Sequence, residues 1–214
     1  LAKRSFIAVN GSLLAARSAL QYGVSCHLAG GTHHSHFDFG SGFCVFNDLA
    51  FTALTLTKTK EVKNILIFDC DVHQGDGTAR ILETNDRTFT CSIHSSKNFP
   101  YRKANSDLDI GLEDNMSWFE YKKHLVEGLI KCIERFSPDL VLYVAGVDIH
   151  TKDKLGRLSI DDEGLFEREM IVLNFFKKRD IPIATVMGGG YSDDKHELAH
   201  RHSTVVKAAH QIWA

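Results

Sequence analysis

The sequence has few of the features that mark specialised classes of protein. Its 214 residues include only 3 prolines and no proline- or serine-rich stretch, so we expect residues 1–214 to form a single domain. No apolar run reaches the length of a transmembrane helix, so we expect no membrane partner. Nothing at the start resembles a signal peptide, and the chain begins at Leu1 without a methionine, which suggests a processed product or a fragment.

Neither charge nor cysteine is in excess. Lys plus Arg number 25 and Asp plus Glu 27, a net charge of -2, so we expect no direct nucleic-acid binding. The 5 cysteines are scattered and form no CxxC pair, which argues against a disulfide framework and favours a reducing, cytoplasmic location. Hydrophobic residues make up 43% of the chain, as in an ordinary globular domain. Histidine is abundant, at 12 residues.

Five short runs of apolar and small residues predict β-strands, and four stretches have helical spacing. The strand runs are 24–29, 64–68, 88–93, 140–145 and 181–187, and the helical stretches are 12–22, 117–136, 161–179 and 194–213. Most strand runs are nearly continuous in apolar residues, which is typical of strands covered on both faces. The sequence therefore predicts an α/β fold with a mostly parallel sheet flanked by helices on both faces.

Each predicted strand runs into glycine or polar residues at its C-terminal end. In chain order these ends are Gly30–His34, Asp69–Gly77, His94, Gly146–Asp148 and Gly188–Tyr191. In open α/β sheets, ligands bind outside the carboxyl ends of the strands. We therefore expect these five ends to build one site.

Asp69, Asp71 and His73 are spaced by two residues. If the backbone there is extended, their side chains project to the same face, with Asp71 and His73 about 7 Å apart along the chain. Asp148, at another strand end, could complete a metal site. Two carboxylates and one imidazole leave a coordination position open for water, as in catalytic sites. The alternative is a buried cluster of ion pairs at a strand end.

His33 and His34 are adjacent and follow a double glycine. By themselves they could be two surface histidines on a loop. However, Asp69 and Asp76 are available to hold one histidine each in a defined tautomer, as carboxylates behind catalytic or metal-binding histidines do.

Several motifs, in order along the chain, resemble the histone deacetylase superfamily, which includes acetylpolyamine amidohydrolases and bacterial acetoin-utilisation proteins. The matching stretches are Gly30–His34, Ser41–Asp48, Asp69–Thr78, Ala145–Asp148 and Gly188–Tyr191. The stretch from Ala145 to His150, with Asp153 and Leu155-Gly156 beyond it, is most similar to bacterial and class IV members. The resemblance implies the arginase/deacetylase-like fold, with the N-terminal part of the family domain missing here.

The resemblance also implies roles for individual residues. It makes Asp71, His73 and Asp148 zinc ligands, and His33 and His34 the catalytic histidine pair, backed by Asp69 and Asp76. Tyr191 matches the tyrosine that donates to the oxyanion. The implied substrate-binding residues are the aromatic walls Phe43 and Phe99, with Gly42 and Gly189 allowing close approach. Asp69, Ser92 and Ile93 match a structural site for K⁺ or Na⁺.

The implied activity is metal-dependent hydrolysis of an acetyl amide, with acetyl-lysine in a protein as the expected substrate. An acetylated polyamine or another small amide is the alternative. Zinc is the metal the resemblance implies, although two carboxylates also suit iron(II). A binding module that holds acyl-lysine without turnover is a further alternative. Nothing indicates the oligomeric state.

Three further features have alternative interpretations. His196-Glu197-Leu198-Ala199-His200 fits the HExxH pattern of zinc proteases, but the longer form of that motif fails, because Ser203 and Val206 replace its glycine and last histidine. The acidic residues between 107 and 114 could attract a cationic substrate, although we expect a solvated loop there. We expect Cys44 to be a small buried core thiol rather than a redox-sensitive one.

Overall fold

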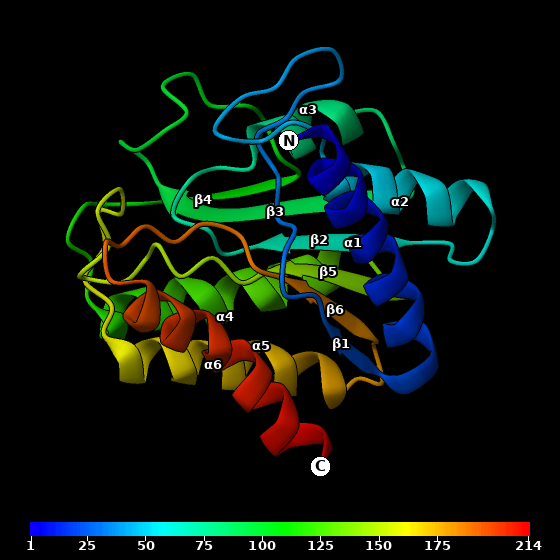
Figure 1. Ribbon diagram of the computed structural model, residues 1–214. Helices are drawn as coiled ribbons and strands as arrows, with labels where there is room; N and C mark the ends of the chain where they lie inside the picture. Colours follow the sequence, from blue (N-terminus) through cyan, green and yellow to red (C-terminus); the bar gives the residue numbers. More distant parts are fainter.

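A single six-stranded sheet runs through the centre of the molecule (Figure 1). The computed structural model describes residues 1–214. Every neighbouring pair of strands is parallel, and the order across the sheet is β1-β6-β5-β2-β3-β4. The strands are β1 (Val24–Cys26), β2 (Ile65–Asp69), β3 (Thr88–Ser95), β4 (Leu108–Leu112), β5 (Leu140–Val144) and β6 (Ile183–Val186). The predicted α/β fold with a parallel sheet is confirmed.

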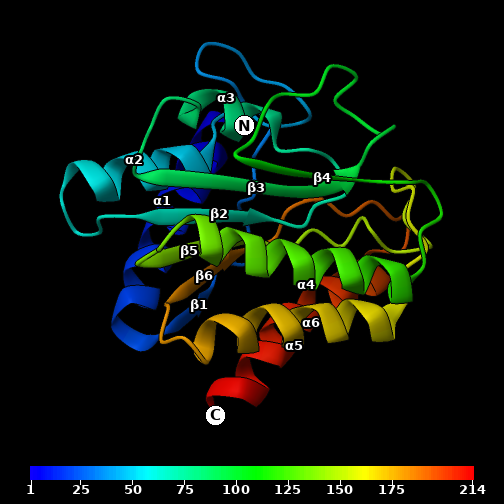
Figure 2. The same ribbon diagram turned by 180° about the vertical axis from the view of Figure 1, so that it is seen from behind.

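Helices cover both faces of this sheet, as Figure 2 shows from behind. They are α1 (Ala2–Tyr22), α2 (Asp48–Lys58), α3 (Asp76–Leu82), α4 (Trp118–Arg135), α5 (Asp162–Lys177) and α6 (Lys195–Trp213). Helices α1 and α2 pack on one face, and α4, α5 and α6 on the other. None of the six helices combines the length and the hydropathy that a membrane crossing requires.

Strand β2 shows why the apolar runs are continuous. Ile65 and Ile67 belong to the hydrophobic cluster beneath α1 and α2, whereas Leu66 and Phe68 belong to the cluster beneath α4, α5 and α6. Successive side chains of a strand point to opposite faces, so a sheet covered on both sides needs apolar residues at every position. Each such side chain, fully buried, contributes about 1.5–3 kcal/mol of hydrophobic free energy.

The helix ends follow local capping rules. Ser117 and Glu120 form the capping box expected at the start of α4. Asp161 caps α5 by accepting from Gly164 N, and Asp194 caps α6. The predicted helices at 117–136, 161–179 and 194–213 are therefore confirmed to within two residues.

The structure also contains elements that sequence patterns did not predict. Helix α1 begins at Ala2 rather than at residue 12, and α2 and α3 fall in stretches without a clear period. The acidic stretch expected to be a solvated loop contains the edge strand β4, so that expectation is wrong. Its acids have partners: Asp107 accepts hydrogen bonds from Thr90, and Asp109 accepts one from Gln74 at 2.8 Å. Charged residues on an edge strand also discourage pairing with other chains.

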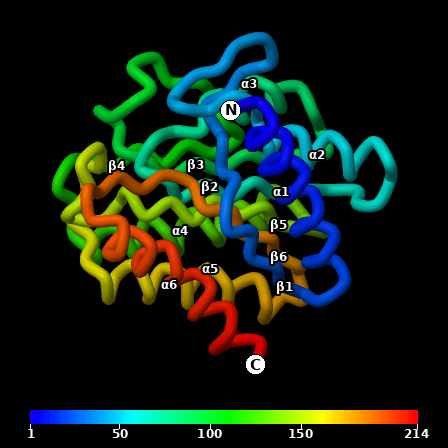
Figure 3. The backbone as a smooth tube through the Cα atoms, viewed as in Figure 1, coloured from blue at the N-terminus to red at the C-terminus, as the bar shows by residue number.

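The segment between β1 and α2 passes beside α3. Figure 3 traces it in lighter blue from β1 toward α3, where Thr78 N donates to His33 O at 3.0 Å. Because all six strands are parallel, their carboxyl ends lie on one edge of the sheet. This segment therefore brings the adjacent histidines to the edge where the polar strand ends gather.

Candidate active site

Three buried side chains converge where β2 and β5 end. Asp71 and His73 follow β2, and Asp148 follows β5, its neighbour in the sheet. His73 Nδ1 lies 3.1 Å from Asp71 Oδ1 and 3.0 Å from Asp148 Oδ2. One ligand atom from each of the three residues lies within 4.8 Å of the others, and all three residues are buried. Two carboxylates and one imidazole at this spacing form a donor set that suits a divalent metal.

Hydrogen bonds, rather than an extended strand, bring these ligands together. Strand β2 ends at Asp69, so the extended backbone considered for residues 69–73 is not what aligns them. Instead Asp69 Oδ1 accepts from Asp71 N at 3.0 Å, and Asp71 Oδ1 accepts from His73 N at 2.9 Å. Asp148 Oδ1 accepts from Val72 N at 2.9 Å, which joins the end of β5 to the end of β2.

The pKa values of Asp148 and His73 indicate whether a cation fits this group of three residues. Burial, and then the Asp71 carboxylate, raise the pKa of Asp148 to about 7. Burial lowers the pKa of His73, but the hydrogen bonds and charges of Asp148 and Asp71 outweigh it and raise that pKa to about 10. Two buried carboxylates this close favour a positive charge between them, as the raised pKa of His73 indicates. A divalent cation in reach of all three donor atoms would supply that charge in place of the His73 proton, so the residues fit a metal.

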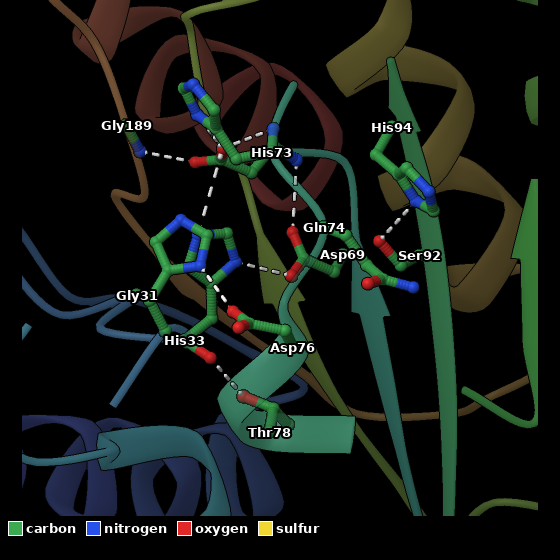
Figure 4. Close-up of polar contacts among 12 residues, drawn as sticks. Gly31, His33, Asp69, His73, Gln74, Asp76, Thr78, Ser92, His94 and Gly189 are labelled. Carbon is green, nitrogen blue, oxygen red and sulfur yellow. Dashed lines mark hydrogen bonds and ion pairs between the residues drawn. The ribbon is translucent and has the colours of Figure 1, made fainter. Parts of the chain in front are cut away.

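The two adjacent histidines each contact a different carboxylate. His33 Nδ1 lies 2.6 Å from Asp69 Oδ2 (Figure 4). His34 Nδ1 lies 2.7 Å from Asp76 Oδ1. Both predicted pairings are therefore present. In a neutral imidazole whose Nδ1 proton is hydrogen-bonded to a carboxylate, Nε2 has a free lone pair and can accept a proton.

The same two histidines differ in charge. Burial lowers the pKa of His33, but the charges of Asp69 and Asp71 outweigh it and raise that pKa to about 9. Burial, and then the charge of His33, lower the pKa of His34 to about 4 despite its bond to Asp76. At neutral pH, His33 is therefore cationic and His34 is neutral.

Two residues at the start of α2 hold the histidine segment in place. Asn47 caps the helix through Oδ1 and uses its amide nitrogen to donate to His33 O at 3.3 Å and Ser35 O at 3.0 Å. Asp48 accepts from Gly31 N at 3.0 Å and from Thr32 N at 2.7 Å. Sequence reasoning did not assign these roles. The asparagine at a helix start was the available signal, because its side chain favours the N-cap position.

A cavity of about 630 Å³ opens above the histidines. Its lining includes His34, His73, Tyr191 and both predicted aromatic walls, Phe43 and Phe99. The ring of Phe99 lies edge-on to His34, with centroids 4.8 Å apart, and the ring of Phe43 lies 6.0 Å from that of Tyr191. The structure thus brings the predicted oxyanion donor and the aromatic walls to the same cavity. Their functional roles stay predictions.

The two predicted substrate-binding glycines make room for site residues. A Cβ atom on Gly42, where φ is 49°, would lie 2.3 Å from His34 Cδ2. Gly189 N donates to Asp71 Oδ2 at 2.6 Å, and a Cβ there would lie 2.1 Å from Asp148 Oδ2. Gly42 lines the cavity, whereas Gly189 packs directly against the carboxylates of Asp71 and Asp148.

The residues assigned to a monovalent cation lie beside the histidine pair. Asp69 and Ser92 are register partners on β2 and β3, and Ile93 follows. Ser92 Oγ lies 3.0 Å from the Nδ1 atom of the buried His94 (Figure 4). The K⁺ or Na⁺ site itself stays a prediction.

Two alternatives from the sequence find no support. His196, Glu197 and His200 are exposed on α6, and the only group of three or more potential metal ligands in residues 1–214 is Asp71, His73 and Asp148. A zinc-protease site is therefore not formed. The expectation that Cys44 is a buried core thiol is wrong, because this residue is half-buried in the loop near the cavity and its thiol contacts Gly42 O at 3.3 Å. Burial raises the pKa of this thiol to about 12, which keeps it protonated.

Comparison with known proteins connects this chain to one family. The model of the histone deacetylase domain matches residues 1–208. An uncharacterized protein of Picosynechococcus sp. is 43% identical over 211 residues, which cover 99% of this chain and 70% of that protein. Histone deacetylase 2 of Arabidopsis thaliana is 31% identical over 186 residues, which cover 86% of this chain and 48% of that protein.

A solved structure shows the same fold. The acetylpolyamine aminohydrolase from Burkholderia pseudomallei matches with a TM-score of 0.78 at 19% identity, covering 94% of this chain and 60% of its own. The chain therefore spans only part of the length of the proteins it matches.

Proposed function

Because the chain belongs to the histone deacetylase family, we propose that it is a zinc-dependent deacetylase that hydrolyses the acetyl amide of acetyl-lysine in proteins. One observation carries this proposal. His73 of the buried Asp71, His73 and Asp148 group and His34 of the two histidine–aspartate pairs line one aromatic-walled cavity.

The metal would be held by Asp71, His73 and Asp148. When bound, a divalent ion supplies Lewis acidity toward an amide carbonyl and a water molecule. Zinc is the proposed ion, with iron(II) as the alternative that the two carboxylates would also accept.

His34 is suited to move the proton. It is neutral at pH 7, because burial and the charge of His33 lower its pKa to about 4. We assign its Nε2 as the base that takes a proton from water as the C–O bond forms, and as the acid that returns it to the departing lysine nitrogen as the C–N bond breaks. Acetate and a free amine are the products.

His33 and Tyr191 would stabilise charge. The cationic His33, held by Asp69 at 2.6 Å, contributes a positive potential beside the reacting carbonyl. Burial raises the pKa of the Tyr191 hydroxyl, so this group keeps its proton and can donate a hydrogen bond to the oxyanion.

The cavity favours acetyl-lysine over an acetylated polyamine. Phe43 and Phe99 present apolar surface to the methylene stem that both substrates share. The charged residues of the lining, apart from its histidines, are Lys154 and Arg157, and no carboxylate lines it. The additional ammonium groups of a polyamine would therefore find no carboxylate in this lining.

Turnover assays with matched substrates test the proposal. Purified protein, with its metal content measured, should show a higher kcat/KM for acetyl-lysine peptides than for acetylated spermidine or putrescine. Preference for the polyamines would favour the alternative substrate. Tight binding of acetyl-lysine peptides by the metal-loaded protein without any acetate release would favour a binding module.

A further inference from the structure

Arg168 is a completely buried arginine on α5, a helix that carries none of the assigned site residues. Its Nη1 donates to Gly146 O at 2.7 Å and to Cys70 O at 3.2 Å. Cys70 immediately precedes Asp71, and Gly146 stands two residues before Asp148. We call the segments that directly follow β2 and β5 the two strand exits. One guanidinium nitrogen therefore binds both strand exits, which carry the carboxylate ligands.

The rest of the guanidinium is held by Glu169, which Tyr143 holds in turn. Arg168 Nε donates to Glu169 Oε1 at 3.1 Å, and Nη2 contacts the same oxygen. Tyr143 Oη donates to Glu169 Oε2 at 2.6 Å. Because the guanidinium is planar with donors in fixed directions, this anchoring sets where Nη1 points.

Stability alone does not account for this cluster. It lies within the hydrophobic cluster beneath α4, α5 and α6, where Cys70 and Tyr143 are core members. Replacing a buried ion pair with apolar residues of similar volume is often neutral or stabilising. An arginine–glutamate pair at this position is therefore explained better by the geometry that it imposes.

The geometry at the two strand exits is tight. A Cβ atom on Gly146 would lie 2.6 Å from Asp71 Oδ2 and 2.8 Å from Asp71 Cα, so the two exits are in direct contact. Val72 N and Asp148 Oδ1 join the same exits at 2.9 Å. A shift of either exit would change the separation of the two carboxylates, and metal affinity depends strongly on the groups that orient the ligands.

We propose that Arg168 is a positioning residue for the metal centre: it sets the separation of Asp71 and Asp148 by binding Cys70 O and Gly146 O at once. This inference rests on the proposed function, because it takes Asp71, His73 and Asp148 to be metal ligands.

Cobalt(II) is the probe for the test, because its visible absorption reports both affinity and coordination geometry. The first variant is Arg168→Lys, which keeps the charge beside Glu169 but lacks the planar fork. Arg201→Lys is the matched control. Arg201 is also a buried arginine, 3% exposed, paired with Glu197 at 2.8 Å on α6, and it contacts neither strand exit. We expect Arg168→Lys to weaken the Co²⁺ Kd at least about tenfold and shift the absorption bands, while Arg201→Lys changes neither.

A second variant separates positioning from stability. The triple substitution Arg168→Met/Glu169→Leu/Tyr143→Phe removes the buried polar cluster as a unit. We expect the metal-free variant to stay folded, with a Tm lowered only by the loss of the donor to Cys70 O and Gly146 O. Its Co²⁺ Kd should weaken at least about tenfold.

The outcomes distinguish this inference from the proposed function. Failure of the wild-type chain to bind Co²⁺ would contradict the proposed metal site. If the wild type binds Co²⁺, an unchanged Kd and spectrum in either folded Arg168 variant would overturn the positioning role. Loss of folding in both variants, with Arg201→Lys folded, would assign Arg168 to core stability and would also overturn it.

Discussion

The backbone N–H of Gly189 donates to Asp71 Oδ2 across 2.6 Å, although the two residues are 118 positions apart in the sequence. Gly189 follows β6, Asp71 follows β2, and β5, which leads to Asp148, lies between these strands in the sheet. The candidate metal centre is therefore built from the ends of three adjacent strands. A substitution of Gly189 should therefore displace the candidate metal ligands, although it changes none of the ligand residues themselves.

Gly189→Ala should weaken metal binding. The new Cβ atom would lie 2.1 Å from Asp148 Oδ2, so the carboxylate must move. We expect the zinc Kd, measured by competition with a chromophoric chelator, to rise at least about tenfold. Gly111→Ala is the control, because its Cβ would meet only the Ser96 side chain. Equal Kd values for the wild type and Gly189→Ala would show that the glycine is not required there.

Tyr191→Phe should reduce catalysis while leaving the metal in place. The hydroxyl is the proposed donor to the oxyanion, and loss of one such donor costs about 3–4 kcal/mol of barrier. We expect kcat to fall at least about a hundredfold, with an unchanged zinc content by elemental analysis. A variant with wild-type kcat would remove Tyr191 from the mechanism.

Metal removal should abolish turnover reversibly. Asp71, His73 and Asp148 form the only group of potential ligands of this kind in the chain, so dialysis against a chelator should empty the centre that activity depends on. We expect acetate release to stop and to return when Zn²⁺ or Fe²⁺ is added. Asp148→Ala, treated in the same way, should not regain activity. Full activity of the chelated wild type would contradict a metal-dependent mechanism.

His202 should make the protein less stable in mild acid. Burial lowers its pKa to about 4, below the ordinary value of 6.5, and its Nδ1 has no hydrogen-bond partner. The unfolded chain therefore binds a proton that the folded chain does not. This contribution to stability is complete above pH 6.5 and falls by about 1 kcal/mol per pH unit as the pH drops toward 4.

Replacement of this histidine should make the free energy of unfolding depend less on pH below 6.5. We expect the unfolding free energy of His202→Leu, from urea titrations between pH 7 and 4, to decline less steeply than that of the wild type. His210→Gln, at an exposed position on the same helix, is the control. Parallel profiles for wild type and His202→Leu would contradict the prediction.

Asn47→Ser should separate helix capping from histidine positioning. Serine can still cap α2, but it lacks the amide that donates to His33 O and Ser35 O. We expect kcat to fall about tenfold or more, because a misplaced general base reduces proton transfer, while the zinc Kd stays unchanged. Thr59→Ser, at the other end of α2, is the control. Unchanged kcat in Asn47→Ser would show that the histidine segment does not depend on this amide.

Much of the fold was accessible from the sequence because the pattern that encodes it is local. Strand β2 is apolar up to its last residue, Asp69, and β5 is hydrophobic throughout. Asp69 and the segment before Asp148 mark where the two strands end. Strand β4 was not accessible, because its alternation of Asp109 and Gly111 with apolar residues, within an acidic stretch, also fits an exposed loop. It becomes a strand only by pairing with β3, which the sequence around it does not specify.

The sequence by itself determined which side chains could do chemistry: a metal-binding pair spaced by two, adjacent histidines with acids to hold them, and a tyrosine after three glycines. Only the tertiary structure decided how these groups are held. Asn47, Asp48 and Arg168 act through backbone groups of segments up to 98 residues away. No local pattern encodes such contacts, because a carbonyl oxygen accepts a hydrogen bond whatever its side chain, and its partner is set by how the helices pack on the sheet.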